Sequence, residues 1–237
     1  MDVTLTLSAN AGLAVAIGGR RIWIDALHDH MVSGFSTLTP AMLAQLWEHE
    51  SFQDPDAILC THCHLDHFSQ PLIEEAAARW PRARIFLPEP RLPRQELIFE
   101  AESAADLGGV QLRFIPLPHE HPERYSLPHW GVLLASGGHT VLFSGDCAVA
   151  TPALTGALAG LTPDLAVLTF PWTALPRGRR AIREELRPSH LALCHLPFAA
   201  DDRFGYRTAL QRILSRYPLP CPVQVLDSFL QTVTFSL

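Results

Sequence analysis

Four potential metal ligands lie within six residues of one short stretch. Residues 61–67 are THCHLDH, which contains three histidines and one aspartate. The stretch follows an apolar run, 57–60, that is too short and too abruptly ended for a helix and is typical of a buried strand. Imidazole nitrogens and carboxylate oxygens are the ligands that zinc and similar divalent cations prefer. A loop at the carboxyl end of a strand is also where α/β proteins commonly build their sites. The stretch therefore predicts a metal site.

The spacing within this stretch indicates two cations rather than one. His62 and His64 are two residues apart, and in an extended loop alternate side chains share a face. Asp66 and His67 are adjacent, so as a pair they suit a second point. Known dinuclear hydrolases hold their cations roughly 3.5–4 Å apart. Other expected strand ends offer His119 or His121, Asp146 and His195 as further ligands. A carboxylate such as that of Asp146 has enough lone pairs to bridge two cations.

The elements that must position these residues are mostly short strands. Alternating or continuous apolar runs predict strands at 3–7, 13–17, 21–25, 57–60, 84–87, 110–115, 130–135, 140–143, 165–170, 191–194, 223–226 and 232–235. Capping residues, proline positions and apolar faces predict helices at 39–48, 69–80, 177–186 and 201–216. The three prolines of 88–103 suggest a turn and a broken helix, and the strands form two groups on either side of 106–109.

Length and composition restrict the class of protein. The chain has 237 residues and no evident linker, so a single domain spanning 1–237 is expected. Its 18 basic residues are all arginines, which excludes lysine-nucleophile and Schiff-base chemistry. The net charge of −6, without a basic stripe, argues against a nucleic-acid partner. The five cysteines are odd in number, which favours a reduced, cytoplasmic location. No signal peptide or membrane span is evident, and the oligomeric state stays open.

The block 61–67 resembles the signature of the metallo-β-lactamase-fold hydrolases. Asp25 after an apolar strand, Gly145-Asp146 after 141–143, and His195 after 191–194 are similar to the other motifs of that superfamily, in the same order. The resemblance extends from about Leu13 to His195 and is closest to a loosely defined lactonase-like branch. It implies an α/β fold: an αββα sandwich of two mixed β-sheets with helices on the outer faces. The metal site would lie along the open edge of the sheets.

The resemblance also implies a role for each matching residue. His62, His64 and a later histidine would hold the first cation. The second would be held by Asp66, His67 and His195, and Asp146 would bridge the two. Asp25 would steady a ligand histidine.

The third histidine departs from the pattern of the family. The family often places it in a Gly-His-Thr-like turn, whereas this chain has PHEH at 118–121. His119 is favoured because it comes soonest after the strand that ends near Ile115. His121 is the alternative ligand, and His129 comes third. His28 and His30 are expected to be exposed loop residues, and Phe170, Trp172 and the region of Phe198 are candidate pocket walls.

These observations favour an enzyme: a dinuclear metal-dependent hydrolase that uses a metal-bridging hydroxide. Its substrate would be a small molecule with an ester, lactone, thioester or phosphodiester bond. Two divalent cations are implied, zinc first, with manganese or iron as alternatives. Asp66 would act in catalysis as both ligand and proton carrier. The competing hypotheses are a metal-dependent nuclease similar to tRNA-processing members, a di-iron redox protein, and a metal-binding protein without turnover.

Overall fold

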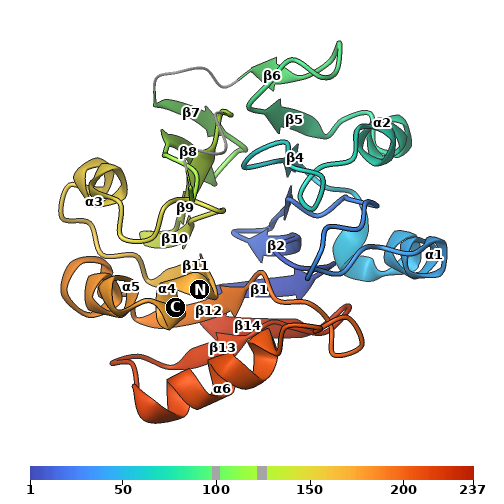
Figure 1. Ribbon diagram of the computed structural model, residues 1–237. Coiled ribbons are helices and arrows are strands. Elements are labelled where there is room, and N and C mark those ends of the chain that lie inside the picture. The colour runs from blue at the N-terminus through green and yellow to red at the C-terminus, as the bar shows by residue number, and fades with distance from the viewer. Residues whose placement is uncertain (98–101, 122–126) are drawn as a thin grey trace.

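The chain folds as two β-sheets that face each other, with helices on both outer faces (Figure 1). The structure, a computed structural model, describes residues 1–97, 102–121 and 127–237. Within these residues each sheet has seven strands, in the orders β14-β1-β2-β3-β4-β5-β6 and β13-β12-β11-β10-β9-β8-β7. Both sheets contain parallel and antiparallel pairs. The predicted αββα sandwich is confirmed.

The first sheet is built from the N-terminal strands and the last strand of the chain. Its members are β1 (Asp2–Leu7), β2 (Leu13–Ile17), β3 (Arg20–Ile24), β4 (Ala57–Leu59), β5 (Arg84–Leu87), β6 (Glu96–Leu97) and β14 (Thr232–Ser236). Helices α1 (Pro40–Glu48) and α2 (Gln70–Arg79) and the 3-10 turn η1 (Glu50–Phe52) cover its outer face. Gly18 and Gly19 both have positive φ, 56° and 75°, as a tight hairpin between β2 and β3 requires.

The second sheet takes the strands in the middle of the chain. Its members are β7 (Ser103–Asp106), β8 (Gln111–Pro116), β9 (Trp130–Ser136), β10 (His139–Phe143), β11 (Leu165–Thr169), β12 (His190–Cys194) and β13 (Val223–Val225). The helical segments beside it are α3 (Pro152–Leu158), α4 (Pro171–Ala174), α5 (Pro176–Ala181), η2 (Ile182–Leu186) and α6 (Tyr206–Arg216). Among the described residues, no helix is long and apolar enough to cross a membrane.

Parallel pairing brings the important strand ends together. In the first sheet β3, β4 and β5 run parallel, so residues that follow them emerge at one edge. In the second sheet β10, β11 and β12 do the same. We call this common edge the metal edge, because Asp25, the block 61–67, Asp146 and His195 follow these strands.

Three apolar layers hold the sandwich together. The central layer lies between the sheets, where the inward residues of β1 to β4 meet those of β8 to β12. A second layer joins the first sheet to α1 and α2, around Trp23. The ring of Trp23 lies 5.6 Å from that of Phe52 and 4.9 Å from that of Trp80. A third layer joins the second sheet to α3 through α6.

Some expected elements are different in the structure. No helix occurs in the described part of 88–103, where Glu96–Leu97 forms a short strand instead; residues 98–101 lie outside the described residues. The change of sheet comes between β6 and β7, not at 106–109, which is the turn of the β7–β8 hairpin. Helix α6 begins at Tyr206 rather than 201, because the carboxylate of Asp202 accepts hydrogen bonds from the backbone N–H of Tyr206 and Arg207 and caps the helix there.

We expect Phe52→Ala to destabilise the protein by about 3–5 kcal/mol, because the side chain is fully buried and its loss leaves a cavity against Trp23. Phe204→Ala is the matched control, since that ring is 59% exposed, and it should change the free energy of unfolding by no more than about 0.5 kcal/mol. Urea unfolding of both variants measures the difference. Equal midpoints would contradict the assignment of Phe52 to the core.

Candidate metal centre

The loop 61–67 is held in place at both ends by hydrogen bonds. It follows β4, and Thr61 donates its backbone N–H to Oδ1 of Asp25 over 2.7 Å. The backbone carbonyl of Thr61 accepts the N–H of Trp130, the first residue of β9, so the loop also contacts the second sheet. At its other end the N–H of His67 bonds the carbonyl of His64 over 3.0 Å. The loop is therefore fixed between the two sheets at the metal edge.

Three histidines gather at the first of two possible cation positions. The ligand atoms of His62, His64 and His119 all lie within 4.8 Å of one another, and Nε2 of His62 is 3.1 Å from Nδ1 of His64. His119 follows β8, and a backbone bridge to Cys147 fixes it beside the end of β10. Its Nδ1 lies 2.5 Å from the carbonyl of Glu120. A histidine that donates one ring nitrogen to a carbonyl presents the other to a metal.

An aspartate and two histidines gather at the second position. The ligand atoms of Asp66, His67 and His195 lie within 4.8 Å of one another. Nε2 of His195 is 3.4 Å from Oδ2 of Asp66, and Nε2 of His67 is 4.0 Å from the same oxygen. His195 follows β12 with a positive φ of 62°, and its N–H bonds the carbonyl of Asn10 over 2.7 Å. A residue that follows a strand of the first sheet, Asn10, thus fixes His195, which follows a strand of the second sheet.

The carboxylate of Asp146 reaches two of these histidines. Its Oδ2 lies 3.3 Å from Nε2 of His67, and its Oδ1 lies 3.6 Å from Nδ1 of His195. Gly145, just before it, has a φ of 52°, and a Cβ there would come within 2.6 Å of Nε2 of His129. Position 145 therefore requires glycine.

Asp25 lies behind the cluster and uses both of its oxygens on protein donors. Oδ1 accepts the N–H of Thr61, and Oδ2 accepts the Thr61 hydroxyl over 2.7 Å and faces Nδ1 of His67 over 3.0 Å. The side chain is buried, and its backbone φ is 52°. Asp25 therefore fixes the ring of His67 and leaves Nε2 of that ring facing the cluster.

Burial and charge shift the pKa values of the cluster in opposite directions. Burial on its own lowers the pKa of His67, but the carboxylates of Asp146, Asp25 and Asp66 raise it well above its usual value. Burial raises the pKa of Asp146, but the nearby His195 and His67 hold it well below its usual range. Burial, with the charge of His67, lowers the pKa of His62. At neutral pH the metal-free cluster thus combines the ionised carboxylate of Asp146 with a neutral His62 and a protonated His67.

The donor set fits divalent cations. Oδ1 of Asp146 and Nε2 of His195 are both buried and make no hydrogen bond with any described residue. Leaving buried polar atoms without hydrogen bonds is costly, and a cation in contact with them would remove that cost. Neutral imidazole with carboxylate oxygen is also a preferred ligand combination for zinc, iron and manganese.

One sequence prediction about the histidines near the cluster is wrong. His28 was expected to be exposed, but it is fully buried, while His30 is exposed as predicted. Burial lowers the pKa of His28 to about 4. His129, which comes third among the candidate ligands, is buried, and its ring centroid lies 5.1 Å from that of His62. His121 is exposed and belongs to none of the ligand groups found among the described residues.

Sequence reasoning also missed residues that support the cluster. The Asn10 side chain donates to the carbonyl of Ser36 over 2.8 Å and accepts its N–H over 2.9 Å, which fixes the loop after β3. From that loop, the ring of Phe35 stacks on His195 with centroids 4.3 Å apart. Asn10 has a positive φ of 52°, and an asparagine two residues before a glycine, between two apolar runs, is the turn signal that could have identified it. Of the predicted pocket walls, Trp172 is instead buried in the third apolar layer.

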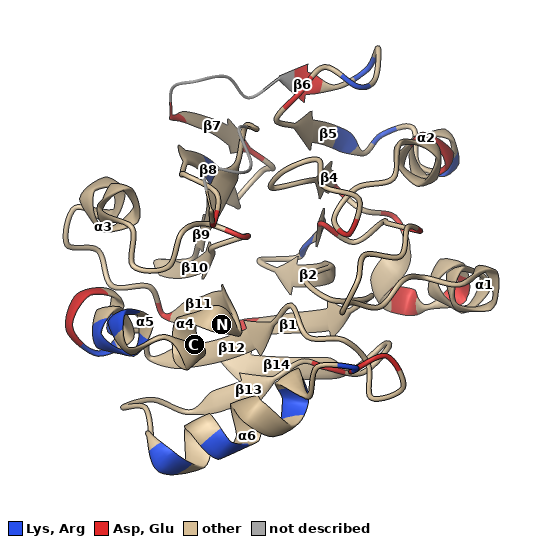
Figure 2. Ribbon diagram, viewed as in Figure 1, with Lys and Arg blue, Asp and Glu red and all other residues tan. Residues whose placement is uncertain are grey.

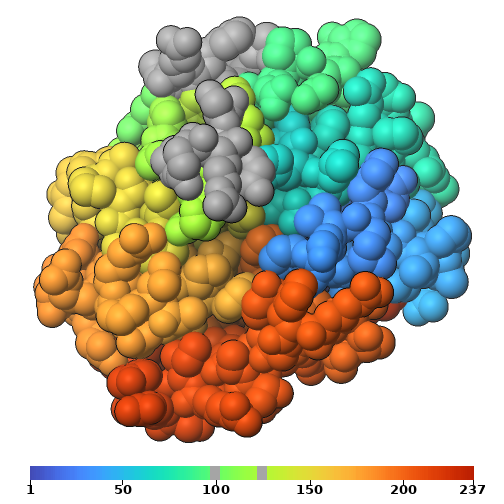
Figure 3. Space-filling view, in the orientation of Figure 1, coloured from blue at the N-terminus to red at the C-terminus, as the bar shows by residue number. Residues whose placement is uncertain are grey.

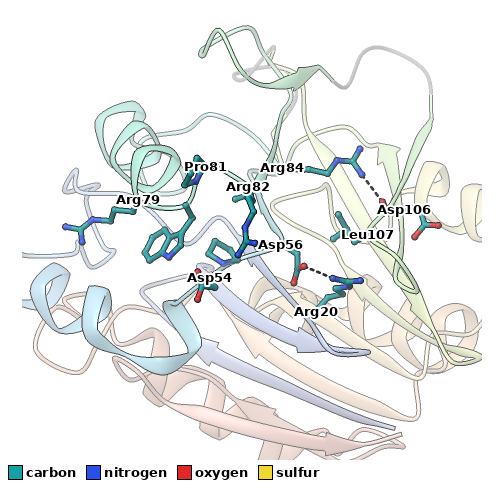
Figure 4. A pocket seen from close by; sticks show the side chains of 12 residues that line it. Arg20, Asp54, Asp56, Arg79, Pro81, Arg82, Arg84, Asp106 and Leu107 are labelled. Atoms are coloured by element: carbon teal, nitrogen blue, oxygen red, sulfur yellow. Dashed lines mark hydrogen bonds and ion pairs between the residues drawn. The ribbon is translucent and has the colours of Figure 1, made fainter.

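A hollow lined by arginines and aspartates lies at the edge of the sandwich opposite the metal edge. It has a volume of about 630 Å³ and lies among the residues that precede or begin β3, β4 and β5 (Figure 4). Its arginines are largely paired: Nη1 of Arg20 lies 2.9 Å from Asp56, and Arg84 bonds Glu96 and the carbonyl of Asp106. The clustered histidines are at the metal edge, so the candidate site is there.

We expect Asp25→Asn to lower the affinity for a divalent cation by about 10–100-fold, because an amide cannot accept from both Thr61 and His67 without presenting its own N–H to one of them. Asp29→Asn is the matched control, since Asp29 is exposed and contacts only His30 in the described structure. Equilibrium dialysis against zinc measures both. An unchanged affinity in Asp25→Asn would contradict the positioning role of this residue.

Cation binding should also release a proton. In the metal-free protein the raised pKa keeps His67 protonated at neutral pH, and Nε2 must lose that proton before it can bind a cation. Affinity for zinc should therefore rise with pH until the pKa of His67 is passed. Calorimetric titrations in buffers of different ionisation enthalpy count the protons released. An affinity that is constant from pH 6 to 8, with no proton release, would contradict this.

Comparison with known proteins gives a consistent result. A family model described as the β-lactamase superfamily domain matches residues 20–202. No curated protein matches the chain. Among solved structures, a metallo hydrolase from the archaeon Ignicoccus hospitalis is 17% identical, with a TM-score of 0.69 and 100% of both chains covered. An isothiocyanate hydrolase from Delia radicum gut bacteria is 16% identical, with a TM-score of 0.69 and 100% of both chains covered.

A further solved structure has a different activity. The di-iron β-hydroxylase from Streptomyces venezuelae is 14% identical and has a TM-score of 0.62; the match covers 99% of this chain and 54% of that one. At these identities the solved structures establish the fold alone. The family model covers most of the chain, and the protein therefore belongs to the β-lactamase superfamily domain family and has the metallo-β-lactamase fold.

Proposed function

We propose that the protein is a dinuclear metal-dependent hydrolase that acts on a small molecule. The observation that carries this proposal is the placement of two ligand groups side by side at one buried edge. His62, His64 and His119 would hold the first cation, and Asp66, His67 and His195 the second, with Asp146 between them. Two divalent cations so placed would lower the pKa of a shared water to near neutrality and polarise the bond to be broken. Zinc is the first expectation, with manganese or iron as alternatives.

The residues of the chain supply positioning and proton transfer. Asp25 and Thr61 fix the loop that carries four of the ligands, so the geometry exists before substrate binds. The Asp66 side chain is 10% exposed, and His67 and His195 hold its pKa below the usual range against the effect of burial. It is therefore an ionised carboxylate beside the cluster and is suited to accept a proton from the attacking water.

A small-molecule substrate suits the charge distribution. Arginines gather on α5 and α6 (Figure 2), while the cluster itself consists of carboxylates and imidazoles. A nucleic acid would need a basic track to its phosphates, and the net charge of −6 offers no excess of positive charge. An ester, lactone, thioester or phosphodiester bond is compatible with the site.

A di-iron redox protein is the second candidate. The solved di-iron β-hydroxylase with the same fold favours it, and the donor set accommodates iron as well as zinc. Metal analysis of the purified protein distinguishes the two. Tightly bound iron whose spectrum changes with O₂ would favour redox chemistry; zinc or manganese together with ester hydrolysis favours the first proposal.

We expect His62→Ala to abolish metal-dependent hydrolysis, because it removes a ligand of the first position. Asp66→Asn should lower kcat by about 10²–10⁴-fold, the range typical of a lost proton acceptor. His139→Ala is the control, since this histidine begins β10 at the opposite edge and contacts Asp164. The measurement is turnover of a panel of esters, lactones and phosphodiesters by zinc-loaded protein. A fully active His62→Ala variant would overturn the proposal.

A further inference from the structure

Beside the metal edge lies a second, apolar hollow that the site described above does not use. It has a volume of about 540 Å³, within the usual range for ligand pockets. Half of the ten described residues that line it are prolines, and we call it the proline pocket after Pro88, Pro90, Pro116, Pro118 and Pro128. These prolines come from the loop after β5, the end of β8 and the approach to β9. Because proline fixes its own φ, this wall is formed before any ligand binds.

The proline pocket opens beside the candidate metal centre. His129 forms part of its wall, and the ring of His129 lies 5.1 Å from that of His62 and 5.6 Å from that of His119. Pro118, also in the wall, directly precedes His119. A molecule whose reacting bond lies at the histidines therefore has room to extend into this pocket.

The described wall has no Lys or Arg side chain to pair with an anion, and its buried side-chain donors are limited to the indole N–H of Trp130 and the ring of His129. The prolines have no N–H, and the N–H groups of Leu117 and Trp130 are already bonded to the carbonyls of His129 and Thr61. No arginine lines the pocket among the described residues. Glu89 is the one acidic residue of the described lining, and its carboxylate pairs with Arg91 over 2.8 Å. A phosphate or carboxylate in the pocket would lose its hydration without a cationic partner, which is costly.

Apolar side chains also stand exposed around the same edge. Four large hydrophobic side chains are exposed among the described residues. Three of them, Met31, Leu65 and Phe204, lie on loops after β3, β4 and β12, which are strands that end at the metal edge. Phe204 joins a series of ring contacts through Tyr206 and Phe35 to His195. The space-filling view is hollowed near its centre, between blue residues of the first sheet's loops and orange residues of the second sheet's side (Figure 3). Apolar ligands, rather than ionic ones, suit such surroundings.

We propose that the proline pocket binds an uncharged apolar group of the substrate, so that the preferred substrates are neutral esters or lactones with a hydrocarbon chain or ring, not phosphodiesters. The substrate preference rests on the proposed hydrolase function, whereas binding of an apolar group in the proline pocket does not. The apolar group lies against the prolines, Leu117 and Leu127, and the bond to be broken lies toward His62 and His119. His129 stands between the two regions.

Binding can be tested without turnover. Uncharged methyl ketones of six, eight and ten carbons, which cannot be hydrolysed, are titrated into the protein by calorimetry. Affinity should rise about fourfold per methylene, equivalent to about 0.8 kcal/mol, until the pocket is filled. Leu127→Arg should weaken the ten-carbon ketone at least tenfold, because it places a charge in the apolar wall. Leu161→Arg is the matched control, since Leu161 is also half-buried but lies in the loop before β11 at the opposite edge.

Activity then separates this inference from the proposed function. Zinc-loaded protein is assayed with p-nitrophenyl esters of increasing acyl length and with bis-p-nitrophenyl phosphate. A kcat/KM that rises with acyl length and exceeds that for the phosphodiester supports the proline pocket. Ester hydrolysis that does not depend on acyl length, faster turnover of the phosphodiester, or equal ketone binding by the two leucine variants overturns it. Chain-length-dependent ketone binding without hydrolysis of any substrate would uphold the pocket and count against the hydrolase.

Discussion

The buried carboxylate of Asp25 is the interaction on which the metal edge depends. It accepts hydrogen bonds from the backbone N–H and the hydroxyl of Thr61, and it faces Nδ1 of His67. It therefore fixes the first and last residues of the loop 61–67. A buried charge costs several kcal/mol unless it is fully bonded, and the positive φ of Asp25 adds about 1–2 kcal/mol. Both unfavourable contributions are retained because these contacts hold the four ligands of the loop 61–67 in one arrangement. The raised pKa of His67 is the electrostatic counterpart, since three carboxylates surround one buried imidazole.

Both sheets contribute residues to the cluster, and hydrogen bonds from each sheet fix residues that follow strands of the other. Asp25 and the loop 61–67 come from the first sheet, whereas His119, Asp146 and His195 follow strands of the second. Backbone bonds cross between them, from Trp130 to Thr61 and from His195 to Asn10. The relative position of the ligands therefore depends on the packing of the central apolar layer, so a change in that layer alters the site without touching it.

Most of the fold follows from local pattern. Apolar runs on either side of Gly18-Gly19 identified the hairpin of β2 and β3. A threonine cap before proline identified α1, and the Thr39 side chain does accept a hydrogen bond from the N–H of Met42. The pattern was insufficient at Ser103–Asp106, SAAD, where an exposed edge strand carries no apolar alternation. The pattern also predicted a start of α6 that is too early in the chain. The capping aspartate is Asp202, and Gly205 has a left-handed backbone conformation just before the first helical residue. Edge strands and helix ends depend on neighbours, which periodicity does not record.

By itself the sequence determined which residues can bind a cation and that they follow strands: the block 61–67, Asp146 and His195 need only residue type and spacing. Only the tertiary structure decided which later histidine joins His62 and His64. Three candidates lie within eleven positions of one another, and the geometry brings together His119, leaves His121 at the surface and buries His129 in the wall of the proline pocket. It also buried His28, which sequence placed in solvent. The physical reason is that the direction of a side chain in a loop is set by the backbone angles and by contacts with distant strands, such as the bridge between His119 and Cys147, and neither is encoded in spacing along the chain.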